Sequence, residues 1–216
     1  MDKIELFSYE ACPFAQRTRI ILNEKNISYK LTEIDLQNKP KWWNNISPLG
    51  KVPLLKINEN VIYESRIINE FIEEAFPNPP LLPKDIYLRS TARIWIDYCD
   101  SYLLPSIHNL VNSQNDEKQN ENKNILIEKL IFLEEHAFKY YQFGPYFMGN
   151  DMSLVDIQFI PFFERFPSYE HYWDIKIPKE CINLLNWLNI MNTKESYLST
   201  ANSDDYHIER YKKYIK

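Results

Sequence analysis

The proline-dense segment at residues 77–85 constrains the fold of this chain more than any other stretch. Four of its nine residues are proline, and neither a helix interior nor a central strand tolerates proline at that density. Before this segment, short alternating apolar runs mix with helical stripes; after it, the apolar period is helical throughout. We therefore expect a linker at 77–85 between a mixed α/β domain at 1–76 and an all-α domain at 86–216.

The first domain has an ordered series of patterns. Residues 3–8 alternate and predict a strand, 13–25 carry a helical stripe, and 28–35 alternate again. Because a helix joins the first two strands, they should be parallel. A hairpin is expected over 52–63 and a helix over 64–76. With a short helical or irregular segment before the hairpin, the predicted order is βαβαββα.

The second domain carries helical stripes at 86–111, 126–140 and 179–192, and its tail at 204–216 is charged and aromatic. Pro105 should bend the first of these helices, because a proline inside a helix lacks the N–H for the backbone ladder. The polar stretch that follows this helix, up to Lys123, is expected to be mobile.

A capping box is predicted at the start of another apolar helix in this domain. Ser153 can cap the helix while Asp156 reaches back to its start. This arrangement fixes where a buried helix begins. We assign it to stability and not to catalysis.

Cys12 stands at the predicted start of the first helix, with Pro13 at the first helical position. Thiols at helix N-termini can have pKa values of roughly 3.5 to 7.5 instead of about 8.5, and the ionised sulfur is the nucleophile. Ala15 stands where a Cys-x-x-Cys motif has its second cysteine, so the chemistry needs an external thiol. The alternative is that Cys12 is a small buried hydrophobe at a helix entry.

Composition excludes several classes of function. The net charge is −5 and no block of lysine and arginine occurs, which argues against a nucleic-acid surface. No apolar run approaches eighteen residues and no leader pattern is evident, so we expect a soluble, cytoplasmic protein without a membrane partner.

Cys12, Cys99 and Cys181 are widely spaced, which fits a reducing compartment, and the last two are expected to be packing residues. The four histidines show no paired spacing, so no metal site is predicted.

Pro53 begins a predicted strand, where it cannot donate to the ladder. We expect a cis bond after Val52, which would leave the Val52 N–H and C=O able to pair with an extended peptide beside Cys12. The alternative is an ordinary trans proline at a sheet edge, which base rates favour.

Four stretches together resemble the thioredoxin-like half of glutathione S-transferases, and most of all the omega class. They are residues 12–19 (CPFAQRTR), 38–42 (NKPKW), 47–53 (SPLGKVP) and 63–65 (YES). The likeness is close over residues 3–83 and holds by pattern beyond. Stringent starvation protein A-type proteins, which associate with RNA polymerase, are more distantly similar. The resemblance implies a thioredoxin-like domain followed by an all-helical one.

The resemblance also implies a glutathione site and no metal cofactor. Glu64 precedes a helix and could accept the ligand's amine, while Ser65 could cap that helix, whose amides would hold a ligand carboxylate. Without a ligand, Ser65 would be a plain cap and Glu64 a solvated charge. The other implied contacts are Val52 and Pro53 with the cysteinyl backbone, Lys39 with the glycyl carboxylate, and Phe14, which either packs beside the ligand or staples the first helix to the core.

The implied reaction is thiol–disulfide exchange, in which Cys12 forms a mixed disulfide with glutathione and a second glutathione resolves it. Likeness to omega enzymes also suggests dehydroascorbate reduction and a homodimer. A second-substrate pocket is expected between the two halves, lined by Trp95, Tyr98 and Tyr102 and extended by aromatic residues at 172–173. One alternative is a conjugating transferase that uses a hydroxyl from Ser8 or Tyr9. The other is a regulatory protein that binds RNA polymerase.

Overall fold

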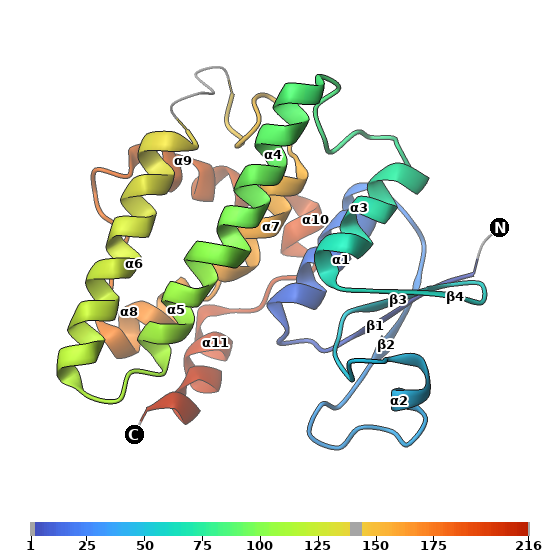
Figure 1. Cartoon of the computed structure of the whole chain (residues 1–216), viewed down its shortest axis with the longest axis horizontal. Coiled ribbons are helices and arrows are strands. Elements are labelled where there is room, and N and C mark those ends of the chain that lie inside the picture. Colours follow the sequence, from blue (N-terminus) through green and yellow to red (C-terminus); the bar gives the residue numbers. More distant parts are fainter. Residues whose placement is uncertain (1–2, 139–143, 216) are drawn as a thin grey trace. The chain divides into compact units, whose positions relative to one another are not determined.

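The computed structural model describes residues 3–138 and 144–215 (Figure 1). The chain folds into two compact units. The first unit holds Met1–Leu81 and Glu195–Thr200, and the second holds Leu82–Lys194 and Ala201–Lys216. Within the range predicted as the helical domain, a short segment therefore belongs to the first unit. The domain limits proposed from the sequence stay a prediction.

The first unit follows the predicted order βαβαββα, so this part of the fold class is confirmed. Its elements are β1 (Ile4–Ser8), α1 (Pro13–Glu24), β2 (Lys30–Glu33), α2 (Trp43–Ile46), β3 (Leu54–Ile57), β4 (Asn60–Tyr63) and α3 (Ser65–Ala75), to which α10 (Glu195–Leu198) is added from later in the chain.

The strands form one mixed sheet in the order β2-β1-β3-β4. β1 pairs with β2 in parallel, as the helical crossover requires, and antiparallel with β3, so Leu6 lies opposite Leu31 on one side and Leu55 on the other. β3 and β4 form the predicted antiparallel hairpin. Leu6 and Phe7, adjacent on the central strand, are both buried because both faces of the sheet are covered.

Helices cover the two faces of this sheet. α1 and α3 pack together on one face, and α2 lies on the other (Figure 1). Trp43 of α2 is fully buried, and its ring lies 5.5 Å from that of Phe7. The large apolar side chain explains why so short a helix stays attached to the sheet.

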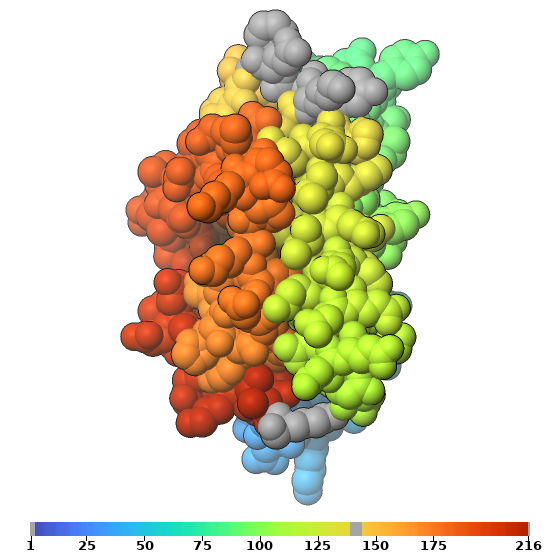
Figure 2. All heavy atoms as spheres, turned by 90° about the vertical axis from the view of Figure 1, so that its left-hand side faces the viewer, coloured from blue at the N-terminus to red at the C-terminus, as the bar shows by residue number. Residues whose placement is uncertain are grey.

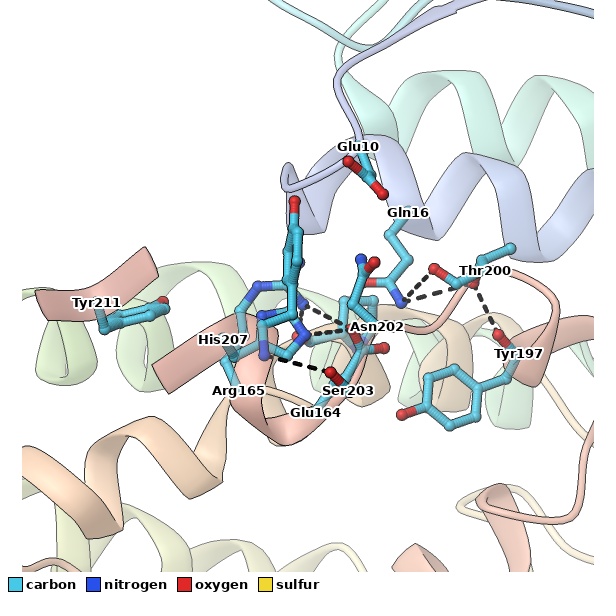
Figure 3. Close-up of polar contacts among 12 residues, drawn as sticks. Glu10, Gln16, Glu164, Arg165, Tyr197, Thr200, Asn202, Ser203, His207 and Tyr211 are labelled. Carbon is cyan, nitrogen blue, oxygen red and sulfur yellow. Dashed lines mark hydrogen bonds and ion pairs between the residues drawn. The ribbon is translucent and has the colours of Figure 1, made fainter. Parts of the chain in front are cut away.

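The segment that contains α10 packs on α1. Ser196 Oγ donates to Glu24 Oε2 at 2.6 Å. The buried Gln16 amide donates to the Thr200 carbonyl at 3.4 Å (Figure 3). These contacts join residues more than 170 positions apart, so the stability of α1 depends on a late part of the chain.

The second unit is helical, as predicted. Its elements are α4 (Ile86–Tyr98), the π-helical turn η1 (Cys99–Leu103), α5 (Leu104–Val111), α6 (Asp116–His136), α7 (Leu154–Phe163), α8 (Phe166–Trp173), α9 (Ile182–Met191), α11 (Asp204–Tyr211) and the short 3-10 helix η2 (Lys212–Tyr214). All residues of α7 are buried. Figure 2 shows α6, in yellow-green, lying against the orange segment that contains α8 and α9.

Two sequence expectations about this unit have different outcomes. The helix predicted over 86–111 is interrupted by the π-helical turn η1, and Pro105 follows in the first turn of α5; the expected bend at Pro105 stays a prediction. The polar stretch after it is not simply a mobile connection, because α6 begins at Asp116. Asn115 caps that helix by accepting from Lys118 N at 2.9 Å, and two acidic residues in the first turn favour the helix dipole.

The capping box predicted at α7 is confirmed. Ser153 Oγ accepts from Val155 N at 3.2 Å, and Asp156 Oδ2 accepts from Ser153 N at 2.8 Å. The other Asp156 oxygen accepts from Trp187 Nε1 at 2.7 Å and from Phe147 N at 3.1 Å. Burial raises the pKa of Asp156 while these donors oppose the rise. The carboxyl group thus joins α7 to two other parts of the core.

A second buried carboxyl group, that of Glu164, joins α11 to the end of α7 (Figure 3). Glu164 Oε1 lies 2.7 Å from His207 Nε2 and accepts from Asn202 N at 3.2 Å. Arg165, also buried, donates to the Pro161 carbonyl. This cluster fixes the C-terminal helix on the second unit.

Candidate functional site

Cys12 is the N-cap residue of α1, with Pro13 at the first helical position as predicted. Its backbone is extended, and Cys12 N donates to Tyr9 O at 2.8 Å, which closes a turn before the helix. The Cys12 side chain makes no capping hydrogen bond, and no acidic residue stands in the first turn of α1. The partly exposed thiol donates to Val52 O at 3.9 Å. The sulfur therefore lies at the N-terminus of α1, whose first turn contains no acidic residue.

A cavity of about 120 Å³, here called the Val52 cavity, opens in the first unit. The Val52–Pro53 peptide bond beside it is cis, as predicted. Val52 both lines this cavity and accepts from the Cys12 thiol, which places the sulfur next to the cavity. The lining residues are Phe14, Ser47, Leu49, Lys51, Val52, Pro53, Tyr63, Glu64 and Ser65.

Glu64 and Ser65 both line the Val52 cavity, but their helix positions differ from the prediction. Glu64 is the N-cap residue of α3, and Ser65, expected as the cap, is its first helical residue. Glu64 has φ +69° and makes no side-chain capping bond. A positive φ at a residue other than glycine costs roughly 1–3 kcal/mol, and residues strained in this way cluster at active sites, ligand clamps and switch regions. The strained turn directs an exposed carboxylate to the cavity.

Phe14 lines the Val52 cavity and is 39% exposed, so its ring is accessible from the cavity. The Arg17 guanidinium lies 5.0 Å from the centre of its ring. Lys39 is not among the lining residues. Its Nζ would lie 3.4 Å from a Cβ placed on Gly50, so its ammonium lies over the loop that contributes Leu49 and Lys51.

Four lining residues were given no role by sequence reasoning: Ser47, Leu49, Lys51 and Tyr63. The first three belong to one loop, which Ser47 Oγ closes by donating to Lys51 O at 3.1 Å. The sequence feature that could have indicated these lining residues is the pair of turn-forming residues Pro48 and Gly50. They bring the backbone of the loop close to the following strand.

The two hydroxyl side chains considered for conjugation differ in burial. Ser8 is fully buried in β1. Tyr9 is half-buried and, like Cys12, packs against the core cluster that contains Phe7 and Trp43. Neither residue lines the Val52 cavity.

The aromatic residues predicted for the second substrate lie together in the second unit. Trp95, Tyr98 and Tyr102 line an open groove of about 750 Å³ along α4, η1 and α6. Tyr98 stacks on Tyr102 and on Phe132, with ring centres 5.4 and 5.3 Å away. Burial raises the pKa of Tyr98, whose hydroxyl donates to Lys129 O at 2.9 Å. Tyr102 is 53% exposed, whereas Trp95 and Tyr98 are mostly core.

Cys99 and Cys181 are fully buried, as predicted for packing residues. The Cys99 thiol donates to Gln158 O at 3.7 Å. Burial, together with the nearby Glu134 and Glu180, raises the pKa of Cys181 to about 11. At neutral pH the Cys181 thiol is therefore protonated.

Metal ligation and membrane crossing find no support in the described residues, 3–138 and 144–215. These ranges contain no group of three or more His, Cys, Asp or Glu side chains that could hold a metal ion. None of the helices in them is long and apolar enough to cross a membrane.

Comparison with known proteins gives a consistent result. A family model described as "Glutathione S-transferase, N-terminal domain" matches residues 6–80. The chain is 34% identical over 197 residues to glutathione S-transferase U19 of Arabidopsis thaliana, covering 90% of this chain and 88% of that protein. It is also 34% identical over 168 residues to glutathione S-transferase omega-1 of Sus scrofa, covering 77% and 68%.

Solved structures agree with these sequences. The Tau class glutathione S-transferase MiGSTU from mango, Mangifera indica, superposes with a TM-score of 0.92 at 27% identity, covering 99% of both chains. Rice GST1 in complex with glutathione superposes with a TM-score of 0.88, also at 27% identity, covering 100% of this chain and 99% of that one. Both the sequence and the fold are therefore similar to one family over nearly the whole chain.

Proposed function

Because this chain belongs to the glutathione S-transferase family, we propose that it is a glutathione-dependent thiol transferase in which Cys12 is the nucleophile. The observation that carries the proposal is the position of the Cys12 thiol at the N-terminus of α1, 3.9 Å from the carbonyl of a residue that lines the Val52 cavity. Amide dipoles at a helix start favour the thiolate. Likeness to the pig omega-1 protein supports this choice.

Glutathione would lie in the Val52 cavity with its backbone along Val52. Its γ-glutamyl ammonium would meet the exposed Glu64 carboxylate, and the adjacent carboxylate would lie at the first amides of α3, beside Ser65. Phe14 and Pro53 would enclose the middle of the ligand. The ammonium of Lys39, above Gly50, would meet the glycyl carboxylate together with Lys51. Likeness to rice GST1, solved with glutathione, supports a glutathione site.

The reaction proceeds by exchange of one disulfide for another. The Cys12 thiolate attacks the glutathionyl sulfur of a mixed disulfide, the old S–S bond breaks, and the other thiol leaves as its thiolate and takes a proton from water. Glutathione is then bound to Cys12 by a new S–S bond. A second glutathione thiolate attacks the glutathionyl sulfur, so oxidised glutathione leaves and Cys12 is restored as thiolate.

Further parts of the proposal concern substrate and assembly. The same cysteine chemistry would reduce dehydroascorbate. We assign the second substrate to the groove lined by Trp95, Tyr98 and Tyr102, whose open, aromatic surface suits an apolar group. We further propose a cytoplasmic homodimer.

A conjugating transferase is the second candidate, supported by likeness to the tau-class mango enzyme and to U19 of Arabidopsis. Conjugation needs a donor that keeps the glutathione thiolate free. The burial of Ser8 argues against that hydroxyl, and a cysteine beside the ligand would form a disulfide with it. A regulatory protein without a glutathione site is distinguished by its failure to bind a glutathione matrix.

One assay panel tests the proposal. Purified protein is given glutathione with a small glutathionyl mixed disulfide, with dehydroascorbate or with an aryl halide. We expect turnover of the first two and loss of both in Cys12→Ser. Turnover of the aryl halide alone, unchanged in that variant, would contradict the proposal and favour conjugation.

A further inference from the structure

A second cavity in the first unit has a different lining from the Val52 cavity. It measures about 460 Å³ and is here called the Arg19 cavity. Its polar lining residues are Tyr9, Glu10, Arg19, Glu33 and Asp35, and two aliphatic side chains complete it. One guanidinium and three carboxylates thus converge on one space.

Arg19 is the residue that points to a ligand. It is only 8% exposed. Its Nη2 donates to Glu10 O at 3.0 Å, but within the described ranges its Nε has no hydrogen-bond partner. A buried cationic donor is stable only when it is paired or hydrogen-bonded. Arg19 also lines the Arg19 cavity, so a carboxylate bound there would pair with the charge of its guanidinium.

The acidic side chains have a different role because they are exposed. Glu33 ends β2, and Asp35 follows it in the next loop. Asp35 Oδ1 accepts from Gln37 N at 2.9 Å, which holds its carboxylate in position. A ligand whose carboxylate pairs with the buried Arg19 would therefore have its cationic group among these exposed carboxylates. An ammonium and a carboxylate on one carbon, as in an α-amino acid, match this arrangement.

The Arg19 cavity lies one turn away from the proposed nucleophile. Tyr9 to Cys12 form a turn closed by the 2.8 Å bond between Cys12 N and Tyr9 O, so the two ends of this turn lie within about 7 Å of each other. Tyr9 and Glu10 line the Arg19 cavity, whereas Phe14, just beyond Cys12, lines the Val52 cavity. An extended tripeptide is roughly 10 Å long. Its thiol can therefore reach the sulfur of Cys12 while its amino-acid end remains in the Arg19 cavity.

We propose that the Arg19 cavity binds the γ-glutamyl head of the second glutathione, the one that resolves the Cys12 mixed disulfide. This inference rests on the proposed function. The thiol of the bound glutathione loses its proton to solvent, and its sulfur attacks the glutathionyl sulfur on Cys12. The S–S bond to Cys12 breaks as the new S–S bond forms, Cys12 leaves as thiolate, and oxidised glutathione dissociates.

Binding stoichiometry tests the two sites without turnover. S-methylglutathione, which cannot form a disulfide, is titrated into the full chain and followed by NMR. We expect two sites per chain, with Glu64→Ala weakening only one and Arg19→Lys or Glu33→Gln weakening only the other. Glu33 is exposed, so its substitution leaves the fold intact even where a change of the buried Arg19 does not. Glu59→Gln, a nearly fully exposed carboxylate at the hairpin tip, is the matched control.

Each outcome of the titration decides between the two proposals. One site that responds to Glu64→Ala and not to Glu33→Gln overturns the inference and leaves the proposed function standing. One site with the opposite response removes the Val52 cavity as the glutathione site and supports the Arg19 cavity. No binding at all overturns both. Free glutamate, titrated in parallel, tells whether the Arg19 cavity takes any amino acid or needs the tripeptide.

Kinetics then test the resolving role. Protein that carries glutathione on Cys12 is mixed with increasing glutathione or with 2-mercaptoethanol, which has no amino-acid head. We expect the rate to saturate with glutathione only, and the half-saturating concentration to rise about tenfold in Arg19→Lys and about threefold in Glu33→Gln. The rate with 2-mercaptoethanol should not change in either variant. A rate linear in glutathione and equal in all variants overturns the role.

Discussion

Two cysteines of this chain occupy the same helix position but differ in their exposure and in the charged groups near them. Cys12 is the N-cap residue of α1, and Cys181 is the N-cap residue of α9. Cys12 is partly exposed next to the Val52 cavity, whereas Cys181 is fully buried. The helix dipole is the same in kind at both positions, so it cannot by itself decide which sulfur reacts.

The two cysteines differ in the acidic residues near the first turn of the helix that each one caps. At α9, Glu134 accepts from Asn183 N at 3.0 Å and from Leu184 N at 2.9 Å. A carboxylate thus takes the amides that would stabilise a thiolate, and its charge helps to raise the pKa of Cys181 to about 11. At α1 no acidic residue stands in the first turn. We therefore expect Cys12, which has no acidic residue in the first turn of its helix, to be ionised more readily than Cys181.

The largest expected effect separates the two sulfurs by activity. Cys12→Ser should lower glutathione-dependent reduction of a mixed disulfide by at least about 10³-fold, because the nucleophile is lost. Cys181→Ser should leave the rate unchanged and only lower the melting temperature. Initial rates and thermal unfolding of both variants measure this. Equal loss of rate in both variants would contradict the assignment of Cys12 alone as the nucleophile.

Glu64→Ala tests whether the surroundings of Cys12 form a binding site. Removing one partner of a charge-assisted contact should weaken glutathione binding by about 1.5–3 kcal/mol. Titration calorimetry measures the change, with Glu59→Ala as the exposed control. Unchanged affinity in Glu64→Ala would remove this carboxylate from the site.

Glu134→Ala should make the start of α9 resemble that of α1. Loss of the carboxylate that caps α9 should lower the free energy of unfolding by about 1–2 kcal/mol. It should also lower the pKa of Cys181 from about 11, because one of the groups that raise it is gone. Denaturant unfolding and the pH dependence of Cys181 alkylation measure the two effects. Glu135→Ala, which removes a nearby charge that does not cap α9, should change the stability by less than about 0.5 kcal/mol.

Phe14→Glu makes the reverse change and has the smallest effect. A carboxylate in the first turn of α1 competes for the amide dipoles, and such contacts contribute about 0.3–1 kcal/mol. The alkylation rate of Cys12 by iodoacetamide at pH 7 should fall by about two- to fivefold relative to Phe14→Gln. Equal rates in the two variants would show that the first turn does not activate the sulfur.

Local patterns explain most of what the sequence predicted correctly. The alternation around Leu6 and the proline after Cys12 determine the strand, the turn and the start of α1. The capping box at Ser153 and the helix interruption before Pro105 are likewise local. In each case a residue and its near neighbours carry the physical cause, so one sequence suffices.

Long-range contacts explain what was not predicted. The return of Glu195–Thr200 to α1 depends on Gln16 and Glu24, which lie far away in the chain. The start of α6 was missed because its first turns are polar, and the left-handed backbone at Glu64 has no signal when glycine is absent. A second cis bond, Asn78–Pro79, was not predicted either. The Arg19 cavity joins three separate segments, which no single motif reveals.

Disulfide mapping tests most directly whether Cys12 is the reactive cysteine of this chain. The protein is mixed with oxidised glutathione at pH 7, digested without reductant, and each cysteine-containing peptide is identified by mass spectrometry. We predict glutathione on Cys12 within the mixing time and none on Cys99 or Cys181 while the protein stays folded. Modification of Cys181 at a rate equal to that of Cys12, or no modification of Cys12, would contradict the claim.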